Sequence, residues 1–355
     1  MPELQELEDG CLRADRGRLE RLERAIHPFR RFLVLTHDNP DPDSMASAWL
    51  LGKVLGKLGR SVALAYGGMV GRTENRAMID VLRLPLRPLA SFDLDSFDAF
   101  GIVDAQPGTG NNSLPPARPT IVFDHHPRRR RRRGVVYEDI REEYGATTTI
   151  LFEYLLAAGI HPDRRLATAV FHAIRSETQN LGREAGRADA RAFLACFPLV
   201  NNQALSRIEN SRLPRNWFEM IDQAIDGTRI YGDVAVTLLG QIPVPDMVAE
   251  FADLIVRLEG IAWALSIGRY GSDLLLSIRT NETDENAGRV IRKIVAGQGT
   301  AGGHEMIAGG KLTGAASTDA QSRRTEQLLV RRLLEALHKR GVRPRHLSRV
   351  PGPGR

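Results

Sequence analysis

Residues 32–44 read FLVLTHDNPDPDS, and this stretch decides the fold of the N-terminal half of the chain. Its first five residues, Phe32 to Thr36, form a short apolar run bounded by turn residues, which predicts a buried strand. A polar segment follows, and residues from Ser44 to Leu58 have the apolar spacing of a helix that Gly59 would end. The stretch therefore predicts a strand, a polar loop and a helix in succession.

The same alternation continues beyond this stretch. Further strand candidates cover 61–66, 99–103 and 120–123, and helix patterns occupy 146–158, 164–176 and 187–195. Strands that alternate with helices indicate an α/β fold with a parallel sheet.

The pattern changes near residue 200. Asn, Pro and Gly residues separate short helices over 201–228, which is typical of a connecting region. Beyond it we expect strands at 229–239, 261–268 and 273–279, a helix at 284–296, a glycine-rich loop at 297–303 and a helix at 318–340. The sequence thus predicts a first domain over 1–200, a smaller α/β domain over 229–340 and a disordered tail over 341–355.

Length and composition agree with two globular domains. The chain has 355 residues, of which 42% are hydrophobic, and single cores rarely grow beyond about 250–300 residues. Two cysteines, Cys11 and Cys196, are too few for a disulfide framework or a cysteine-based metal site. No apolar run is long enough for a membrane span, and no signal-peptide pattern opens the chain. We therefore expect a cytoplasmic protein that does not associate with membranes.

Basic residues outnumber acidic ones, 49 to 43, and nearly all of them are arginine. Arginine suits phosphate recognition, although a general compositional preference explains most of the excess. A run of six, Arg128–Arg133, has two interpretations: it attracts nucleic-acid phosphates, or it is a solvated loop. No aromatic residues interleave with the run, so base stacking is not expected there.

Acidic and histidine side chains follow three of the predicted strands. In open parallel sheets, ligands bind beyond the carboxyl ends of the strands. A helix cap would explain one or two of these side chains, but not three strand ends that converge on one edge. The residues are His37, Asp41 and Asp43 after the first strand, Asp104 after the third, and Asp124, His125 and His126 after the fourth.

This set offers nitrogen and oxygen ligands without sulfur. Several carboxylates with imidazoles and no thiolate favour Mn²⁺ among the divalent ions. There are enough ligands for two ions that share one bridging carboxylate. Paired ions can clamp the attacking and leaving oxygens of a phosphoryl displacement, so the residues point to phosphoester hydrolysis.

In order and spacing, His37-x3-Asp41-x-Asp43, Asp104 and Asp124-His125-His126 resemble the motifs of the DHH phosphoesterases. The segment 302–310 resembles the glycine-histidine signature of the DHH-associated C-terminal domain. The arrangement over about 30–340 looks most like the stand-alone NrnA-like members, which combine nanoRNase and pAp phosphatase activity.

The resemblance implies a ligand set for two divalent ions. His37 and Asp41 would hold the first ion, Asp43 and His125 the second, and Asp104 both. In the fourth motif, the family usually carries an aspartate ligand for the second metal. This chain has Glu177 there, one methylene longer, which would reach the metal directly, through water or by a shifted helix.

The remaining residues would act on the substrate. By the resemblance, His126 would contact the scissile phosphate, and Asp124 would orient the histidines. In the second domain, Arg279 and the segment Gly302, Gly303 and His304 would grip another phosphate or base. The substrate would lie in a cleft between the domains.

The expected function is hydrolysis of short oligonucleotides, and of pAp, with two divalent ions, Mn²⁺ first among them. A cyclic-di-AMP phosphodiesterase is the nearest alternative. A catalytically silent nucleotide-binding module is an alternative from another class, supported only by Glu177. A G-x-G-x-x-G match over 297–302 follows a predicted helix instead of a strand, which argues against a dinucleotide site.

Overall fold

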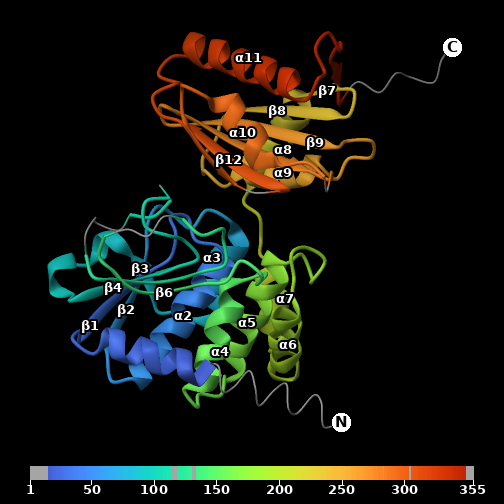
Figure 1. The fold of residues 1–355 in the computed structure, drawn as a ribbon. Helices are drawn as coiled ribbons and strands as arrows, with labels where there is room; N and C mark the ends of the chain where they lie inside the picture. The colour runs from blue at the N-terminus through green and yellow to red at the C-terminus, as the bar shows by residue number, and fades with distance from the viewer. Residues whose placement is uncertain are drawn as a thin grey trace. The chain divides into compact units, whose positions relative to one another are not determined.

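The computed structural model of the chain describes residues 15–109, 111–113, 118–129, 133–282, 284–303 and 305–348. It divides into two compact units, Met1–Ser211 and Arg212–Arg355 (Figure 1). The boundary falls within the segment expected to connect two domains. Helix α7 (Asn202–Glu209) from that segment belongs to the first unit, and α8 (Arg215–Gly227) belongs to the second.

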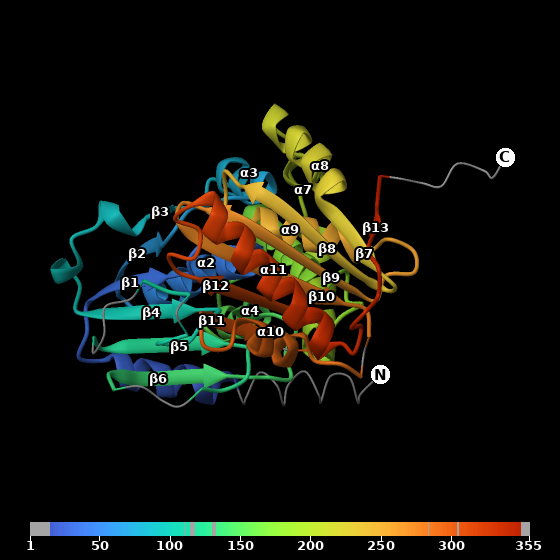
Figure 2. The same cartoon turned by 90° about the horizontal axis from the view of Figure 1, so that it is seen from above.

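A six-stranded sheet forms the centre of the first unit, with strand order β3-β2-β1-β4-β5-β6. Every neighbouring pair is parallel, and Figure 2 shows β1, β4, β5 and β6 as arrows in one direction. The strands are β1 (Arg31–Leu35), β2 (Ser61–Tyr66), β3 (Leu86–Pro88), β4 (Ala99–Val103), β5 (Thr120–Asp124) and β6 (Val135–Ile140). The parallel sheet predicted from sequence is confirmed, and β3 and β6 add unpredicted edges.

Helices cover one face of this sheet. They are α2 (Pro42–Lys57), α3 (Thr73–Leu82), α4 (Thr147–Ala157), α5 (Arg164–Glu177) and α6 (Arg187–Cys196), with a further helical segment at 15–26. Short 3-10 turns η1 (Leu89–Ser91) and η2 (Leu94–Ser96) lie on the opposite face, and η3 (Phe197–Leu199) follows α6.

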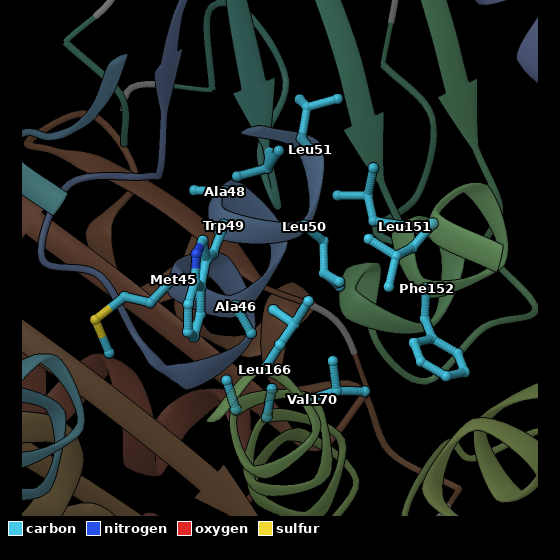
Figure 3. Close-up of a cluster of buried hydrophobic side chains, with 14 of the residues drawn as sticks. Met45, Ala46, Ala48, Trp49, Leu50, Leu51, Leu151, Phe152, Leu166 and Val170 are labelled. Carbon is cyan, nitrogen blue, oxygen red and sulfur yellow. The ribbon is translucent and has the colours of Figure 1, made fainter. Parts of the chain in front are cut away.

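The core of the first unit lies between the sheet and helices α2, α4 and α5. Trp49 and Leu50 of α2 pack with Leu151 of α4 and Leu166 and Val170 of α5 (Figure 3). Burial of one such side chain contributes about 1.5–3 kcal/mol. This apolar cluster anchors α2 and α4, whose N-termini carry the residues described below.

The second unit contains a seven-stranded sheet of order β11-β12-β10-β9-β8-β7-β13. Its strands are β7 (Thr228–Tyr231), β8 (Val234–Gln241), β9 (Trp263–Tyr270), β10 (Asp273–Thr280), β11 (Thr300–Gly303), β12 (Ile307–Leu312) and β13 (Arg345–His346). Only β8 and β9 pair in parallel within the described residues. Helices α10 (Ala287–Val295) and α11 (Asp319–Ala336) cover one face, and α8 and α9 (Met247–Ile255) cover the other.

Two sequence expectations for this unit were wrong in detail. The single strand expected at 229–239 is a hairpin of β7 and β8, because Gly232 adopts a left-handed conformation (φ 70°) that reverses the chain. The glycine-rich loop expected at 297–303 ends in strand β11, which pairs with β12. The predicted class, a parallel α/β unit followed by a smaller α/β unit, is confirmed. Among the residues described, no helix is long and apolar enough to cross a membrane.

Candidate metal centre

Three loops meet at the carboxyl ends of β1, β4 and β5, which are neighbours in the sheet. They bring together two groups of side chains, and within each group all the ligand atoms lie within 4.8 Å of one another. One group is His37, Asp41 and Asp104, and the other is Asp104, His125 and His126. Because Asp104 belongs to both groups, its carboxylate lies where a bridging ligand would lie.

Asp104 is buried and held in a constrained conformation. Its φ of 58° is in the left-handed region, which costs a non-glycine residue about 1–3 kcal/mol. Its Oδ2 lies 3.6 Å from His37 Nε2 and its Oδ1 lies 3.5 Å from His125 Nε2. Burial, followed by the charge of Asp43, raises the pKa of Asp104 well above its usual value. Such a cluster of buried carboxylates favours a cation.

His37 and Asp41 form a close pair. Asp41 is the N-cap of α2, with Oδ1 accepting a hydrogen bond from Ser44 N (2.9 Å), while its Oδ2 lies 3.3 Å from His37 Nε2. Burial by itself would lower the pKa of His37, but the charge of Asp41 and the hydrogen bond between them raise it to about 9. A cation that bound this imidazole would therefore displace a proton.

Asp43 has a structural role that the sequence did not reveal. Its Oδ2 accepts a hydrogen bond from Thr147 N and its Oδ1 accepts one from Thr148 N, both 2.8 Å. Helix α4 begins after Ala146, which has no capping side chain, so Asp43 caps α4 from a different helix. Burial and the charge of Asp41 raise the pKa of Asp43 to about 6.

The ring of His125 is oriented for ligation through Nε2. Its Nδ1 donates to the carbonyl oxygen of Tyr144 (3.0 Å); because a carbonyl only accepts, Nδ1 carries the proton. Nε2 is buried and has no hydrogen-bond partner within the part of the chain that the structure describes. Burial, then the charge of His126, lowers the pKa of His125. A buried neutral imidazole nitrogen that faces a carboxylate fits a divalent cation.

Asp124 and Gln106 surround His126. Asp124 Oδ1 accepts from His126 Nδ1 (2.9 Å), and Oδ2 accepts from Gln106 Nε2 (2.6 Å). Burial alone would lower the pKa of His126, but Asp124 raises it above its usual value.

Glu177 lies at the C-terminal end of α5, with its carboxylate 3.6 Å from Arg183 Nη2. Burial and the charge of Asp41 raise its pKa. The turn after it is strained, because Gln179, Asn180 and Leu181 all have positive φ. Neither ligand group among the described residues includes Glu177 or Asp43.

The second unit holds the other expected substrate residues. Arg279 lies on β10, where its Nε donates to Asp253 and its Nη1 to Ser277 Oγ (2.8 Å). Gly302 and Gly303 lie on β11, opposite β12. At Gly303 a Cβ would lie 2.4 Å from Ala308, so only glycine allows this close pairing. His304 lies outside the described residues.

The arginine run is described only at its ends. Arg128 Nη1 donates to Glu138 (2.6 Å) and its main-chain amide to Glu142 (2.9 Å). The charge of Arg128 is therefore partly neutralised. Residues 130–132 lie outside the described part of the chain.

Sequence reasoning missed several polar residues that support the centre. Thr147 Oγ1 donates to Asp104 Oδ1 (3.0 Å), and Thr149 Oγ1 donates to Asp189. A run of three threonines at the start of an otherwise apolar helix, with Gln106 two residues beyond Asp104, was the available signal.

No family model matches the chain. An uncharacterized protein of Methanocaldococcus jannaschii is 33% identical over 283 residues, which cover 79% of this chain and 57% of that protein. The chain thus spans a little over half the length of this curated relative.

Two solved structures are similar to this chain to different degrees. An exopolyphosphatase-related protein from Bacteroides fragilis has a TM-score of 0.68 at 12% identity, covering 90% of this chain and 98% of that chain. RecJ in complex with Mn²⁺ from Thermus thermophilus has a TM-score of 0.48 at 16% identity, covering 90% of this chain and 55% of that chain. The first likeness establishes a common fold, and the second is too distant to carry an argument.

Proposed function

We propose, from the premise that this chain has the fold of the DHH phosphoesterases, that it hydrolyses phosphoester bonds in short oligonucleotides or small nucleotides. The observation that carries the proposal is the pair of ligand groups that share Asp104 at the carboxyl edge of β1, β4 and β5. Residues from three separate loops converge there, and helix capping alone would not bring three loops together.

Two divalent ions, with Mn²⁺ preferred, are the proposed cofactor. His37 and Asp41 would hold one ion, Asp43 and His125 the other, and Asp104 both. Glu177 would complete the second set. When bound, such ions stabilise negative charge on the attacking and leaving oxygens of a phosphoryl transfer.

The chain's own groups would orient and stabilise the substrate. His126, whose pKa Asp124 raises above its usual value, would bind the negative oxygens of the reacting phosphate. Asp124 fixes the ring through Nδ1, so Nε2 is the nitrogen turned away from Asp124. In the second unit, Arg279, with Asp253 as its partner, would recognise another part of the substrate.

Hydrolysis of a labelled dinucleotide, pAp and cyclic-di-AMP, with Mn²⁺ and with EDTA, tests this function. Asp104→Asn should lower kcat by at least about 100-fold, whereas Asp80→Asn, on an exposed position of α3, should not change it. Equal hydrolysis in EDTA, or full activity of Asp104→Asn, would contradict the proposal. The order of the three substrates distinguishes an oligonucleotide or pAp hydrolase from a cyclic-dinucleotide enzyme.

A catalytically silent nucleotide-binding module is the second candidate. One observation favours it: Glu177, in place of the family's aspartate, lies beside Arg183 and, among the described residues, outside both ligand groups. In that case nucleotides would bind with Mn²⁺ but no product would form. Glu177→Asp would then be expected to gain hydrolytic activity.

A further inference from the structure

Gln106 lies two residues beyond Asp104, is 4% exposed, and spans two loops of the centre. Its side-chain amide donates to Asp124 Oδ2 at 2.6 Å and to the main-chain carbonyl oxygens of Pro127 at 3.2 Å and His126 at 3.4 Å. Its Oε1 accepts a hydrogen bond from Arg129 N at 2.7 Å. One side chain therefore connects the loop after β4 to the loop after β5.

The two oxygens of Asp124 have separate partners. Oδ1 accepts from the main-chain amides of His125 (3.0 Å) and His126 (3.3 Å) and from His126 Nδ1 (2.9 Å). Oδ2 accepts from Gln106. Because the carboxylate is fixed at both oxygens, it cannot rotate away from the imidazole. Asp124 accepts and His126 Nδ1 donates, so Nδ1 carries a proton.

Few side chains could replace Gln106. It must donate to Asp124 and accept from Arg129 N at the same time, which needs an amide. A glutamate would bring a second carboxylate against Asp124, and an apolar side chain would leave the buried Oδ2 with one donor fewer.

We infer that Gln106 is a positioning residue, which sets the orientation of the His126 ring through Asp124. The inference rests on the proposed function for the role of His126, but the contacts themselves do not depend on it. The competing explanation is that Gln106 only fastens the loop at residues 127–129.

The test uses Gln106→Met, which keeps the length of the side chain and removes its hydrogen bonds. We expect kcat toward a nitrophenyl phosphoester with Mn²⁺ to fall by about 10- to 100-fold, the usual cost of losing such a supporting partner, with little change in KM. In an Asp124→Asn background the same substitution should cost less than about threefold. Asn112→Ala is the matched control and should keep its kcat; among the described residues it loses a bond to the main-chain carbonyl of Gln106 and one to Thr109.

Side-chain ¹⁵N NMR of His126 in the full chain provides a readout independent of turnover. Gln106→Met should change the Nδ1 and Nε2 shifts of His126, and Asn112→Ala should not. The inference would be overturned if Gln106→Met lowered kcat equally in the native and Asp124→Asn backgrounds, or if the His126 shifts did not change. Gln106 would then only fasten the loop. If the native chain hydrolyses no substrate, the proposed function fails, and the NMR result still decides the role of Gln106.

Discussion

Removal of one charge from the acidic cluster should stabilise the metal-free protein. Asp41, Asp43 and Asp104 are packed together in the first unit, and the pKa of Asp43 is raised from 3.8 to about 6 by burial and by Asp41. A rise of about two in the pKa corresponds to about 3 kcal/mol. The folded state favours the protonated carboxyl, so this cost is fully present at pH 7 and shrinks as the pH falls toward 4.

Asp104→Asn is the sharpest form of this perturbation. The amide keeps an oxygen to accept from Thr147 Oγ1 (3.0 Å), and it replaces a buried carboxyl whose pKa is raised by burial and by its acidic neighbours. We expect a gain of about 2 kcal/mol in EDTA at pH 7, or about 4–8 °C in the Tm of the first unit.

With Mn²⁺ the native chain should instead be more stable than Asp104→Asn. The native chain should gain about 2.7 kcal/mol at an ion concentration of 100 times Kd, while Asp104→Asn should gain little. Differential scanning calorimetry of the full chain measures both effects, with the transition of the second unit as internal reference and Asp80→Asn as control. If Asp104→Asn melted below the native chain in EDTA, or gained as much from Mn²⁺, the cluster would not be a cation site.

Four further substitutions test the first unit. Thr147→Val removes the hydroxyl donor to the bridging carboxylate and should weaken Mn²⁺ binding by about 10- to 100-fold, as measured by titration calorimetry; unchanged affinity would refute its supporting role. Gly67→Ala would place a Cβ 1.8 Å from Asp38 Oδ1 and should lower activity through displacement of that loop, whereas Gly56→Ala, with nothing within 4 Å in helix α2, should stabilise by about 1 kcal/mol. Burial raises the pKa of Asp139, but its hydrogen bonds to a buried arginine lower it overall, so Asp139→Asn should cost about 3 kcal/mol at pH 7. The difference in the free energy of unfolding between the native chain and Asp139→Asn, measured in urea, should narrow as the pH falls through about 4.

The central strands of the parallel sheet, β1, β2, β4 and β5, were predictable because each has a local apolar signal followed by turn residues. β4 lies at 99–103, the range that its apolar run predicts. The hairpin at Gly232 was not predicted, although Gly232 and Asp233, the two residues between β7 and β8, are typical of a hairpin turn. Helix α9 was not predicted either, although its residues have a strong apolar pattern.

The candidate site was predictable where side chains directly follow strands. His37, Asp104 and His125 converge because neighbouring parallel strands end at one edge. Gln106 and Thr147 were missed, because their hydrogen bonds join segments 18 and 43 residues apart. The contact of Gln106 depends on the pairing of β4 with β5, and that of Thr147 on the position of α4, neither of which a local pattern contains.

The cap that Asp43 places on helix α4 makes two amide protons sensitive to the centre. Thr147 N and Thr148 N donate to the carboxylate that is proposed to bind an ion. Loss of that ion would let the carboxylate protonate and weaken its hold on the first turn of α4. The rate of hydrogen–deuterium exchange at these two amides would then show whether the ion is bound, so backbone exchange in α4 measures metal loading.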